Sequence, residues 1–92
     1  TGVQTCALPI CCRVEVEKMI ATGRIDMVVE TTQYIYVLEL KLSDNGGVDA
    51  AAEQIRAKQY AEPFKADKRK VIALAIELDD RGKGLVDWKE VF

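Results

Sequence analysis

The sequence predicts an α/β fold in which a mixed β-sheet carries a helix on at least one face. Two segments, Arg24–Thr31 and Tyr34–Leu42, are rich in β-branched and aromatic residues and flank the turn Thr32–Gln33, which is typical of a β-hairpin. Apolar residues then recur at helical spacing over 48–60, and 71–78 is a nearly continuous apolar run, as in a strand covered on both faces. A hairpin followed by a crossover helix and another strand implies a mixed sheet.

One more strand is expected before the hairpin. In the segment 12–18, Val14 and Val16 alternate with Glu15 and Glu17, which predicts a half-exposed strand. The predicted order of elements is therefore β-β-β-α-β.

The remaining segments are bounded by turn and helix signals. Ser43–Gly47, with the sequence SDNGG, predicts a loop. The helix over 48–60 has Asp49 near its beginning, where the helix dipole favours an acid, and it ends before Pro63. The terminal stretch 85–92 has a pattern that favours neither helix nor strand.

The composition excludes several classes of function. The chain has 92 residues, enough for one small domain, and its net charge of −2 gives no overall basic field for nucleic acid or membrane, although a local patch could still bind. The absence of histidine excludes histidine-based triads and the commonest zinc ligand. Cys6, Cys11 and Cys12 form no CxxC motif and have no second cluster, so we expect a structural or incidental role. No apolar run approaches the ~20 residues of a membrane-spanning helix, and we expect no membrane contact and a cytoplasmic location.

The first ten residues, Thr1–Ile10, differ from the rest of the chain. Their sequence, TGVQTCALPI, has no charge and no helix or strand pattern, and it looks like the translation of a common sequencing adapter. We therefore expect residues 1–10 to be an adapter-derived scar that is not native and packs poorly or not at all. Residues 11–92 would then be a truncated domain of a longer natural protein.

Three charged residues interrupt the predicted hairpin: Asp26, Glu39 and Lys41. With the turn at Thr32–Gln33, residues whose numbers sum to 65 face each other, so Asp26 lies opposite Glu39 with Cβ atoms roughly 5 Å apart. Lys41 projects from the same face, two residues further on. Two adjacent carboxylates repel unless a proton or cation lies between them, and oxygen ligands suit a hard divalent cation. A lysine beside such a site can hold a phosphate oxygen or the attacking water.

The same three residues could instead be charges on an exposed sheet face. Val28, Ile35 and Val37 share that face, however, so it is not typical of a solvated surface.

Asp26, followed by Glu39-Leu40-Lys41 on the next strand, matches the D…(D/E)xK signature, and the chain resembles the PD-(D/E)xK nuclease superfamily. The resemblance runs from about Val14 to Trp88 and includes the stretches GRIDMVVETTQYIYVLELKL, AAEQIRAKQYAEPF and KVIALAIEL. These stretches are similar to one branch, the domain found at the C-terminus of bacterial chains that begin with an AAA-type ATPase-like domain. Ile25 stands where the name of the motif has proline.

The resemblance implies a restriction-endonuclease-like core and hydrolysis of DNA phosphodiester bonds with Mg²⁺ or Mn²⁺ as cofactor. Asp26 and Glu39 would be the metal ligands, and Lys41 would orient the attacking water or stabilise the developing charge. Gln54 is similar to a glutamine that supports the site in related nucleases and completes the predicted catalytic set. Lys58, one helical turn further on, and Tyr60 are auxiliary candidates, although the six-residue separation of Gln54 and Tyr60 differs from the usual four. Alternatively, Gln54 and Lys58 form a solvated stripe and Tyr60 lies in the core.

The superfamily usually supplies another acid from a helix before the first strand, and here the scar would replace that helix. Glu15 or Glu17 could reach the site from the preceding strand, with Glu17 as the auxiliary candidate, or both could be solvated acids. Without the N-terminal helix this fragment could be inactive.

Several basic residues could contact the phosphates of DNA, or they could be a solvated turn: Lys65, Lys68, Arg69, Lys70, Arg81 and Lys83. Three functions stay open: a metal-dependent nuclease that acts on DNA, a non-cutting module with a binding or regulatory role beside an AAA-type ATPase, and a sheet-rich interaction domain with accidental motif residues. The intact set of Asp26, Glu39 and Lys41 favours the first of these.

Overall fold

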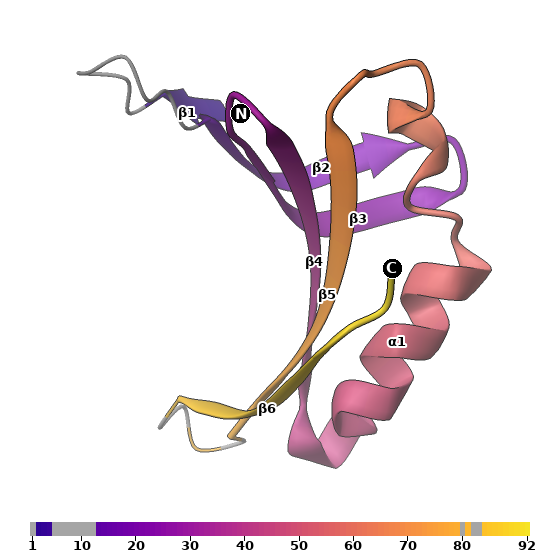
Figure 1. Ribbon diagram of the computed structural model, residues 1–92. Helices are drawn as coiled ribbons and strands as arrows, with labels where there is room; N and C mark the ends of the chain where they lie inside the picture. Colours follow the sequence, from indigo (N-terminus) through magenta and orange to yellow (C-terminus); the bar gives the residue numbers. More distant parts are fainter. Residues whose placement is uncertain (1, 5–12, 80, 82–83) are drawn as a thin grey trace.

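A six-stranded sheet runs through the molecule, its strands lie in space in the order of the sequence, and helix α1 packs against it (Figure 1). The computed structural model describes residues 2–4, 13–79, 81 and 84–92. The strands are β1 (Gly2–Gln4), β2 (Arg13–Ile20), β3 (Gly23–Glu30), β4 (Tyr34–Leu42), β5 (Lys70–Leu78) and β6 (Leu85–Glu90). The helices are α1 (Gly47–Ala57) and the 3₁₀ turns η1 (Ser43–Asn45) and η2 (Glu62–Phe64).

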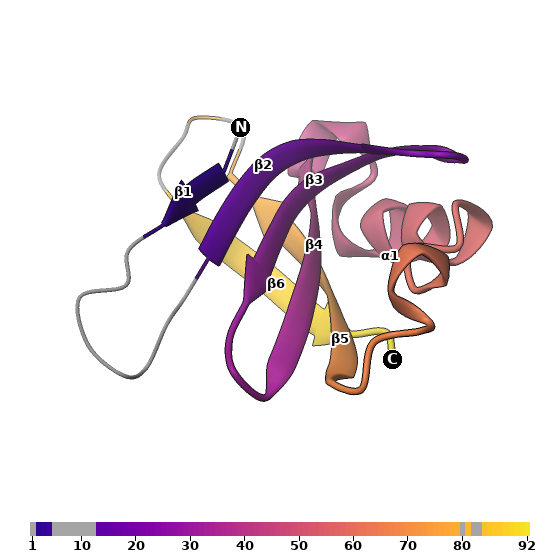
Figure 2. The same ribbon diagram turned by 90° about the horizontal axis from the view of Figure 1, so that it is seen from above.

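The predicted α/β class and mixed sheet are confirmed. Strands β4 and β5 are parallel and are joined through α1, whereas the other neighbouring strands are antiparallel. Seen from above, the helical segments lie together on one side of the twisted sheet (Figure 2). The predicted order β-β-β-α-β corresponds to β2-β3-β4-α1-β5, and β1 and β6 extend the sheet at its two edges.

Strand β6 was not predictable because its side chains lack the alternation of a half-buried strand. Five of its six residues are exposed, and it is paired on one side with β5. Strand β6 is therefore held at the sheet edge mainly by its backbone pairing with β5, because few of its side chains are buried.

Strand β1 contradicts part of the expectation for the first ten residues. Gly2–Gln4 pairs with β2 in an antiparallel register, so these residues do pack. Residues 1 and 5–10 lie outside the described part of the chain, as do Cys6, Cys11 and Cys12. The adapter origin of residues 1–10 stays a prediction.

The core lies between α1 and one face of the sheet. Its fully buried members come from three strands (β3, β4 and β5) and the segment around α1: Ile25, Val28, Ile35, Val37, Ala51, Ala52, Ile55, Tyr60, Ala73 and Ala75. Alanines at the contact between α1 and β5 allow the two backbones to approach closely. The helix therefore sits directly over β4 and β5, and it holds the segment that follows it against the sheet.

The start of α1 is fixed by a side chain from β5. The carboxylate of Glu77 accepts hydrogen bonds from the Val48 backbone N–H (2.9 Å) and the Ser43 hydroxyl (2.6 Å). Anions are favoured at helix N-termini, and Glu77 satisfies an N–H that has no partner within the helix. Gly47 has φ +63°, and a Cβ there would lie 2.3 Å from Glu77 Oε1, so this position requires glycine.

The C-terminus of α1 lies three residues before the predicted end at Tyr60, because Ala57 is its last residue. Gln59 adopts a left-handed conformation with φ +53°. The N–H of Gln59 bonds to the carbonyl of Arg56, and the N–H of Tyr60 bonds to that of Ile55. These are the two hydrogen bonds of a Schellman motif, and the apolar contact that usually accompanies it is between Tyr60 and Ile55, both buried.

Strands β3 and β4 pair in the predicted register only over part of their length. Pairs from Glu30↔Ile35 to Met27↔Leu38 follow the expected sum of 65. Beyond Met27, β3 stays with β2 while β4 continues beside β5. Figure 1 shows the β2–β3 hairpin bending away from β4 toward the segment after α1. In a straight strand, residues three apart face opposite sides of the sheet. The bend in β3 therefore explains why Ile25 and Val28 are both buried.

Candidate functional site

The candidate site lies where the β3–β4 ladder opens. Asp26 is the first residue of β3 beyond the last paired position, Met27↔Leu38. Its Oδ2 accepts a hydrogen bond from the Leu40 backbone N–H at 3.0 Å, so the side chain takes the place of a ladder partner. Asp26 is thereby fixed against β4, and 19% of its side chain is exposed.

Glu39 is almost completely buried, with 2% of its surface exposed. The pKa of its carboxyl group is raised to about 7, chiefly because burial disfavours the charged form. The Tyr60 hydrogen bond and the Lys41 charge lower this pKa, whereas the negative charge of Asp26 contributes to the rise. The protonated form of Glu39 can donate a hydrogen bond to Asp26. The side chains of Asp26 and Glu39, which the sequence predicted to face each other, therefore lie close together.

Lys41 lies two residues beyond Glu39 on β4, so it projects from the same face. It is half-buried, and its positive charge favours ionised Glu39. No hydrogen bond or ion pair joins Lys41 to another described residue. Its ammonium group therefore keeps its donors for a ligand or for water.

Tyr60 connects Glu39 to α1 and to β3. Its hydroxyl group lies 2.7 Å from Glu39 Oε1 and 2.9 Å from the Arg24 carbonyl oxygen, and it accepts a hydrogen bond from Gln54 Nε2 at 3.1 Å. A hydroxyl group has one proton, so Tyr60 shares it between these two acceptors. Burial, together with the Glu39 hydrogen bond, raises the pKa of Tyr60 and keeps this proton in place.

The Schellman motif explains the unusual six-residue spacing of Gln54 and Tyr60. The left-handed residue Gln59 turns the chain back after α1, and this turn brings the Tyr60 hydroxyl under the Gln54 amide. Gln54 itself does not touch either carboxyl group, and it acts on Glu39 through Tyr60. Tyr60 belongs both to the core and to the candidate site.

The sequence profile of the PD-(D/E)XK nuclease superfamily matches residues 3–88. The chain belongs to this superfamily. The resemblance drawn from Asp26, Glu39 and Lys41 is thereby confirmed at the level of the superfamily. No curated protein and no solved structure gave a match to the chain.

Superfamily membership raises the question of whether these residues fit a divalent cation. In the described part of the chain, no three His, Cys, Asp or Glu side chains are grouped so that they could hold a metal ion. Mg²⁺, however, is usually held by only one or two carboxylates, and water and substrate oxygens complete its coordination. The neighbouring carboxyl groups of Asp26 and Glu39, the second of them almost completely buried, match that donor set.

The remaining auxiliary candidates lie at the margin of the site. Lys58 packs its side chain beside Gly23, and its carbonyl oxygen accepts a hydrogen bond from the Thr22 hydroxyl group. Glu17 is largely exposed and binds Arg24, which in turn lies beside Asp26. Glu15, the other acid considered, instead pairs with Lys18 at 3.5 Å.

Arg24 is the residue that the sequence analysis missed. It precedes Asp26 by two residues on one strand, so the two side chains project from the same face. The spacing of two residues along one strand is the sequence signal that places Arg24 beside Asp26.

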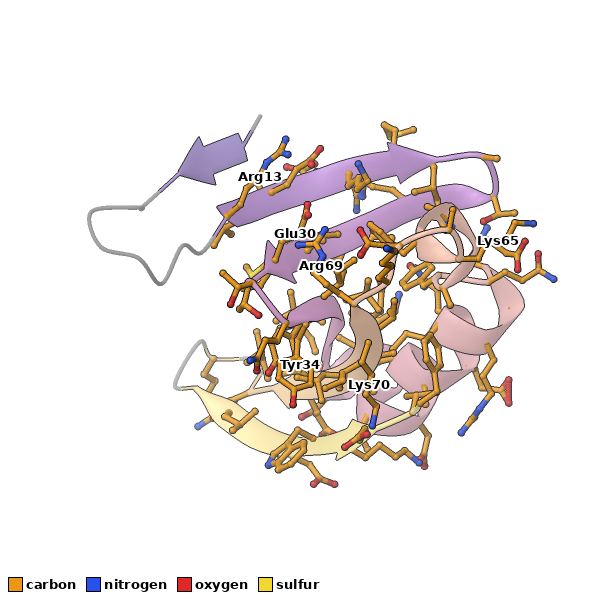
Figure 3. All side chains as sticks on the ribbon, turned by 45° about the horizontal axis from the view of Figure 1, so that its top comes forward. Arg13, Glu30, Tyr34, Lys65, Arg69 and Lys70 are labelled. Carbon is orange, nitrogen blue, oxygen red and sulfur yellow. The ribbon has the colours of Figure 1, made fainter. Side chains whose placement is uncertain are left out.

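Most of the basic residues proposed to contact DNA do not form one patch. In Figure 3 the side chains of Lys65, Arg69 and Lys70 lie apart, and Lys65 pairs with Glu62 at 3.3 Å. Lys68, Lys70 and Arg81 are each exposed or partly exposed, and Lys83 lies outside the described residues.

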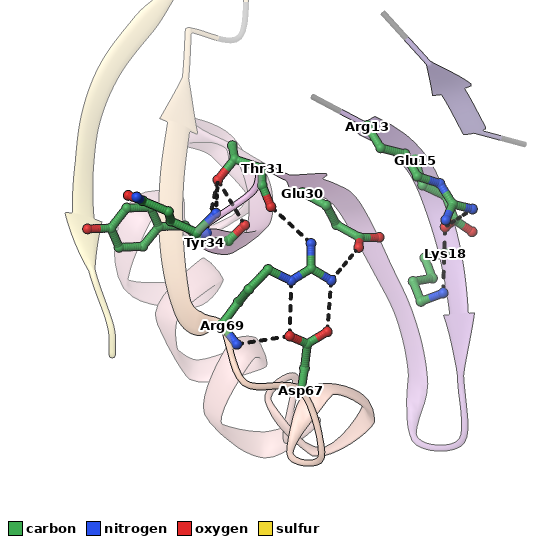
Figure 4. Close-up of polar contacts among 9 residues, drawn as sticks. Arg13, Glu15, Lys18, Glu30, Thr31, Tyr34, Asp67 and Arg69 are labelled. Atoms are coloured by element: carbon green, nitrogen blue, oxygen red, sulfur yellow. Dashed lines mark hydrogen bonds and ion pairs between the residues drawn. The ribbon is translucent and has the colours of Figure 1, made fainter. Parts of the chain in front are cut away.

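Arg69 has a structural role instead. Its guanidinium group donates to both carboxylate oxygens of Asp67, to Glu30 and to the carbonyl oxygen of Thr31 (Figure 4). Hydrogen bonds from Arg69 lower the pKa of Asp67 to about 2. The donors of Arg69 are therefore engaged in tying the segment before β5 to the β3–β4 turn.

No helix among the described residues is long and apolar enough to cross a membrane.

Proposed function

We propose that this domain is a divalent-metal-dependent nuclease that hydrolyses phosphodiester bonds in DNA. The observation that supports it most is the meeting of Asp26 and Glu39 at the open end of the β3–β4 ladder, with Lys41 on the same face. The chain belongs to the PD-(D/E)XK nuclease superfamily, and these three residues match the D…(D/E)xK signature.

In this proposal Asp26 and Glu39 hold Mg²⁺ or Mn²⁺. A bound divalent cation supplies positive charge to the scissile phosphate and lowers the pKa of a water molecule. Lys41 holds a phosphate oxygen or the attacking water, while Tyr60 and Gln54 keep Glu39 in its orientation. The water oxygen forms a bond to phosphorus and the bond to the leaving ester oxygen breaks. One water proton ends on the leaving oxygen and the other passes to solvent.

The test is cleavage of single- and double-stranded DNA with Mg²⁺, Mn²⁺ or EDTA. Asp26→Asn and Glu39→Gln keep most of the shape and hydrogen-bonding capacity of the two acids but remove their charge. Lys41→Met removes the ammonium group, and each of the three changes should lower the rate by roughly 10²–10³-fold.

The matched controls are Glu90→Gln and Lys70→Met, because both residues are exposed on neighbouring strands and neither faces the site. Their cleavage rates should stay within about twofold of wild type. Cleavage by Asp26→Asn as fast as by Glu90→Gln would contradict the proposal.

A non-cutting module with a binding or regulatory role is the second candidate. It is favoured by one observation: the described residues bring two acids together rather than three. Metal-dependent DNA binding without cleavage by a folded wild-type protein would support this second function over the first.

We further propose that residues 1–10 derive from an adapter and that, in the natural chain, the domain follows an AAA-type ATPase-like domain in a cytoplasmic protein. The basis is the sequence of Thr1–Ile10 and the resemblance of the three stretches quoted above. Long-read sequencing of the genomic locus tests both statements, and a locus that encodes these ten residues in frame would refute the first.

A further inference from the structure

The guanidinium group of Arg24 lies beside the carboxylate of Asp26, one of the two site acids, and is open to solvent. Its NH1 donates a hydrogen bond to Glu17 Oε1 at 3.2 Å, and its NH2 lies 3.6 Å from Asp26 Oδ1. The second distance is longer than a hydrogen bond, so the contact with Asp26 is a loose ion pair. With 53% of its side chain exposed, Arg24 keeps free donors next to the site.

Arg69 is a useful comparison, because its guanidinium group is held by several hydrogen bonds within the same protein. Four hydrogen bonds from its side chain reach Asp67, Glu30 and Thr31, and only 28% of the side chain is exposed. Arg24 makes one such bond, through NH1. Its position is therefore not explained by structural hydrogen bonds alone.

Glu17, which holds Arg24, has an unusual backbone. Its φ is +53°, and the β2–β3 pairing skips it, passing from Val16↔Met27 to Lys18↔Ile25. A left-handed conformation is unfavourable for a residue other than glycine, and such residues cluster at functional sites. The skipped position is the one opposite Asp26, so the irregularity of β2 lies directly beside the site.

We propose that Arg24 contacts a phosphate group of the nucleic-acid substrate next to the Asp26–Glu39 pair, and that Glu17 is the residue that positions its guanidinium group. The inference rests on the proposed nuclease function. Guanidinium presents a planar fork of donors that matches two phosphate oxygens, which an ammonium group cannot reproduce. The loose contact with Asp26 can be exchanged for such a ligand because little energy is lost when an exposed ion pair separates.

The first experiment measures binding of a short fluorescein-labelled DNA by anisotropy in EDTA, over a range of KCl concentrations. Arg24→Ala should weaken binding by roughly tenfold and lower the slope of log affinity against log salt by about 1. Arg24→Lys should restore the salt slope but only part of the affinity. Glu17→Gln should weaken binding less than Arg24→Ala, since it loosens the guanidinium group without removing it.

Arg13→Ala is the matched control. Arg13 is also a strand arginine, 59% exposed and paired with a glutamate at 4.0 Å. It pairs in register with Glu30, four residues along β3 from Asp26 and hence about 13 Å away. Its substitution should change DNA affinity by less than about twofold. Equal losses for Arg24→Ala and Arg13→Ala would overturn the proposal.

A second experiment separates substrate contact from mere support of Asp26. Mn²⁺ binding, followed by the electron paramagnetic resonance signal of the free ion, should be as tight in Arg24→Ala as in wild type or tighter, because a positive charge beside Asp26 is removed. Weaker Mn²⁺ binding would overturn the proposal and assign Arg24 to the support of Asp26. A wild type that cleaves DNA while Arg24→Ala binds it normally contradicts the Arg24 proposal alone. A wild type that neither binds nor cleaves DNA contradicts the nuclease function and this proposal with it.

Discussion

Glu39 brings an ionisable group into a core that is otherwise apolar. Its neighbours in the core cluster are aliphatic side chains, alanines and Tyr60, and its carboxyl group interacts with the Tyr60 hydroxyl group and with Asp26. A buried carboxylate is costly unless a cation or strong donors compensate it. The raised pKa of Glu39 expresses that cost, and a bound divalent cation would remove it.

The stability of the metal-free protein should therefore fall as pH rises. The pKa of Glu39 is about 7 in the folded protein against 4.5 for an ordinary glutamate, so between these values the folded state binds more protons than the unfolded state. Stability is lost progressively from about pH 4.5 to about pH 7, by up to roughly 3 kcal/mol, and the loss persists above pH 7. Glu39→Gln places an uncharged side chain at this position at every pH, so the stability of this variant should not fall in this way.

Urea unfolding in EDTA at about pH 5 and about pH 8 checks the sign. Glu39→Gln should be close to wild type at the lower pH and more stable than wild type at the higher one. Added Mg²⁺ should restore part of the wild-type stability at the higher pH. If stability depended on pH identically in Glu39→Gln and wild type, the buried Glu39 carboxyl group would not be the cause of the loss. Glu90→Gln serves as the control for a solvent-exposed acid.

The end of α1 differs from the sequence-based expectation, whereas the bounds of β4 agree with it. Strand β4 has its predicted bounds, Tyr34–Leu42, because its alternation and its aromatic and β-branched content are local signals. The end of α1 was misplaced since Gln59, unlike glycine, gives no local sign of a left-handed conformation. Burial of Tyr60 under Gln54 and against Glu39 imposes that conformation.

Gln59→Gly should consequently stabilise the protein. Relief of a left-handed conformation is worth roughly 1–2 kcal/mol, and the greater freedom of glycine in the unfolded chain offsets part of it, so a net gain of roughly 0.5–1 kcal/mol is expected. Thermal unfolding should show a rise in Tm of a few degrees, with DNA cleavage unchanged. Gln33→Gly is the control, because Gln33 is exposed in a turn without a positive φ. A lower Tm for Gln59→Gly than for Gln33→Gly would contradict the argument.

In the molecule as a whole, the order of elements and the meeting of Asp26 with Glu39 could be predicted, whereas the contacts that support the site could not. The hairpin register follows from the turn at Thr32–Gln33 and a side-chain period of two. The placement of Arg24 and Glu17 depends on a break in the β2–β3 pairing, and the role of Arg69 depends on a loop that returns to the β3–β4 turn. Such tertiary contacts leave no periodic trace in a single sequence.

Arg69 joins two parts of the chain that are distant in sequence, the loop before β5 and the β3–β4 turn. Its guanidinium fork binds Asp67 in the loop before β5 and also reaches Glu30 and Thr31 at the β3–β4 turn (Figure 4). Arg69→Lys keeps the charge but cannot form the bidentate contact and the two others at once, so Tm should fall by roughly 5 °C.

The comparison for Arg69→Lys is Arg13→Lys, where one long ion pair is at stake and Tm should change little. Arg69→Lys should also reduce the loss of stability on acidification below about pH 4, because the pKa of Asp67 would return toward its ordinary value. In wild type, stability starts to fall as the pH drops to the ordinary pKa of Asp67 in the unfolded chain, and it continues to fall until the pH is below the folded-state pKa of about 2. The reason is that protonation of Asp67 weakens its hydrogen bonds with Arg69. If Arg69→Lys and Arg13→Lys have the same Tm and the same acid response, Arg69 does not fasten the loop, and its donors would again be candidates for phosphate contacts.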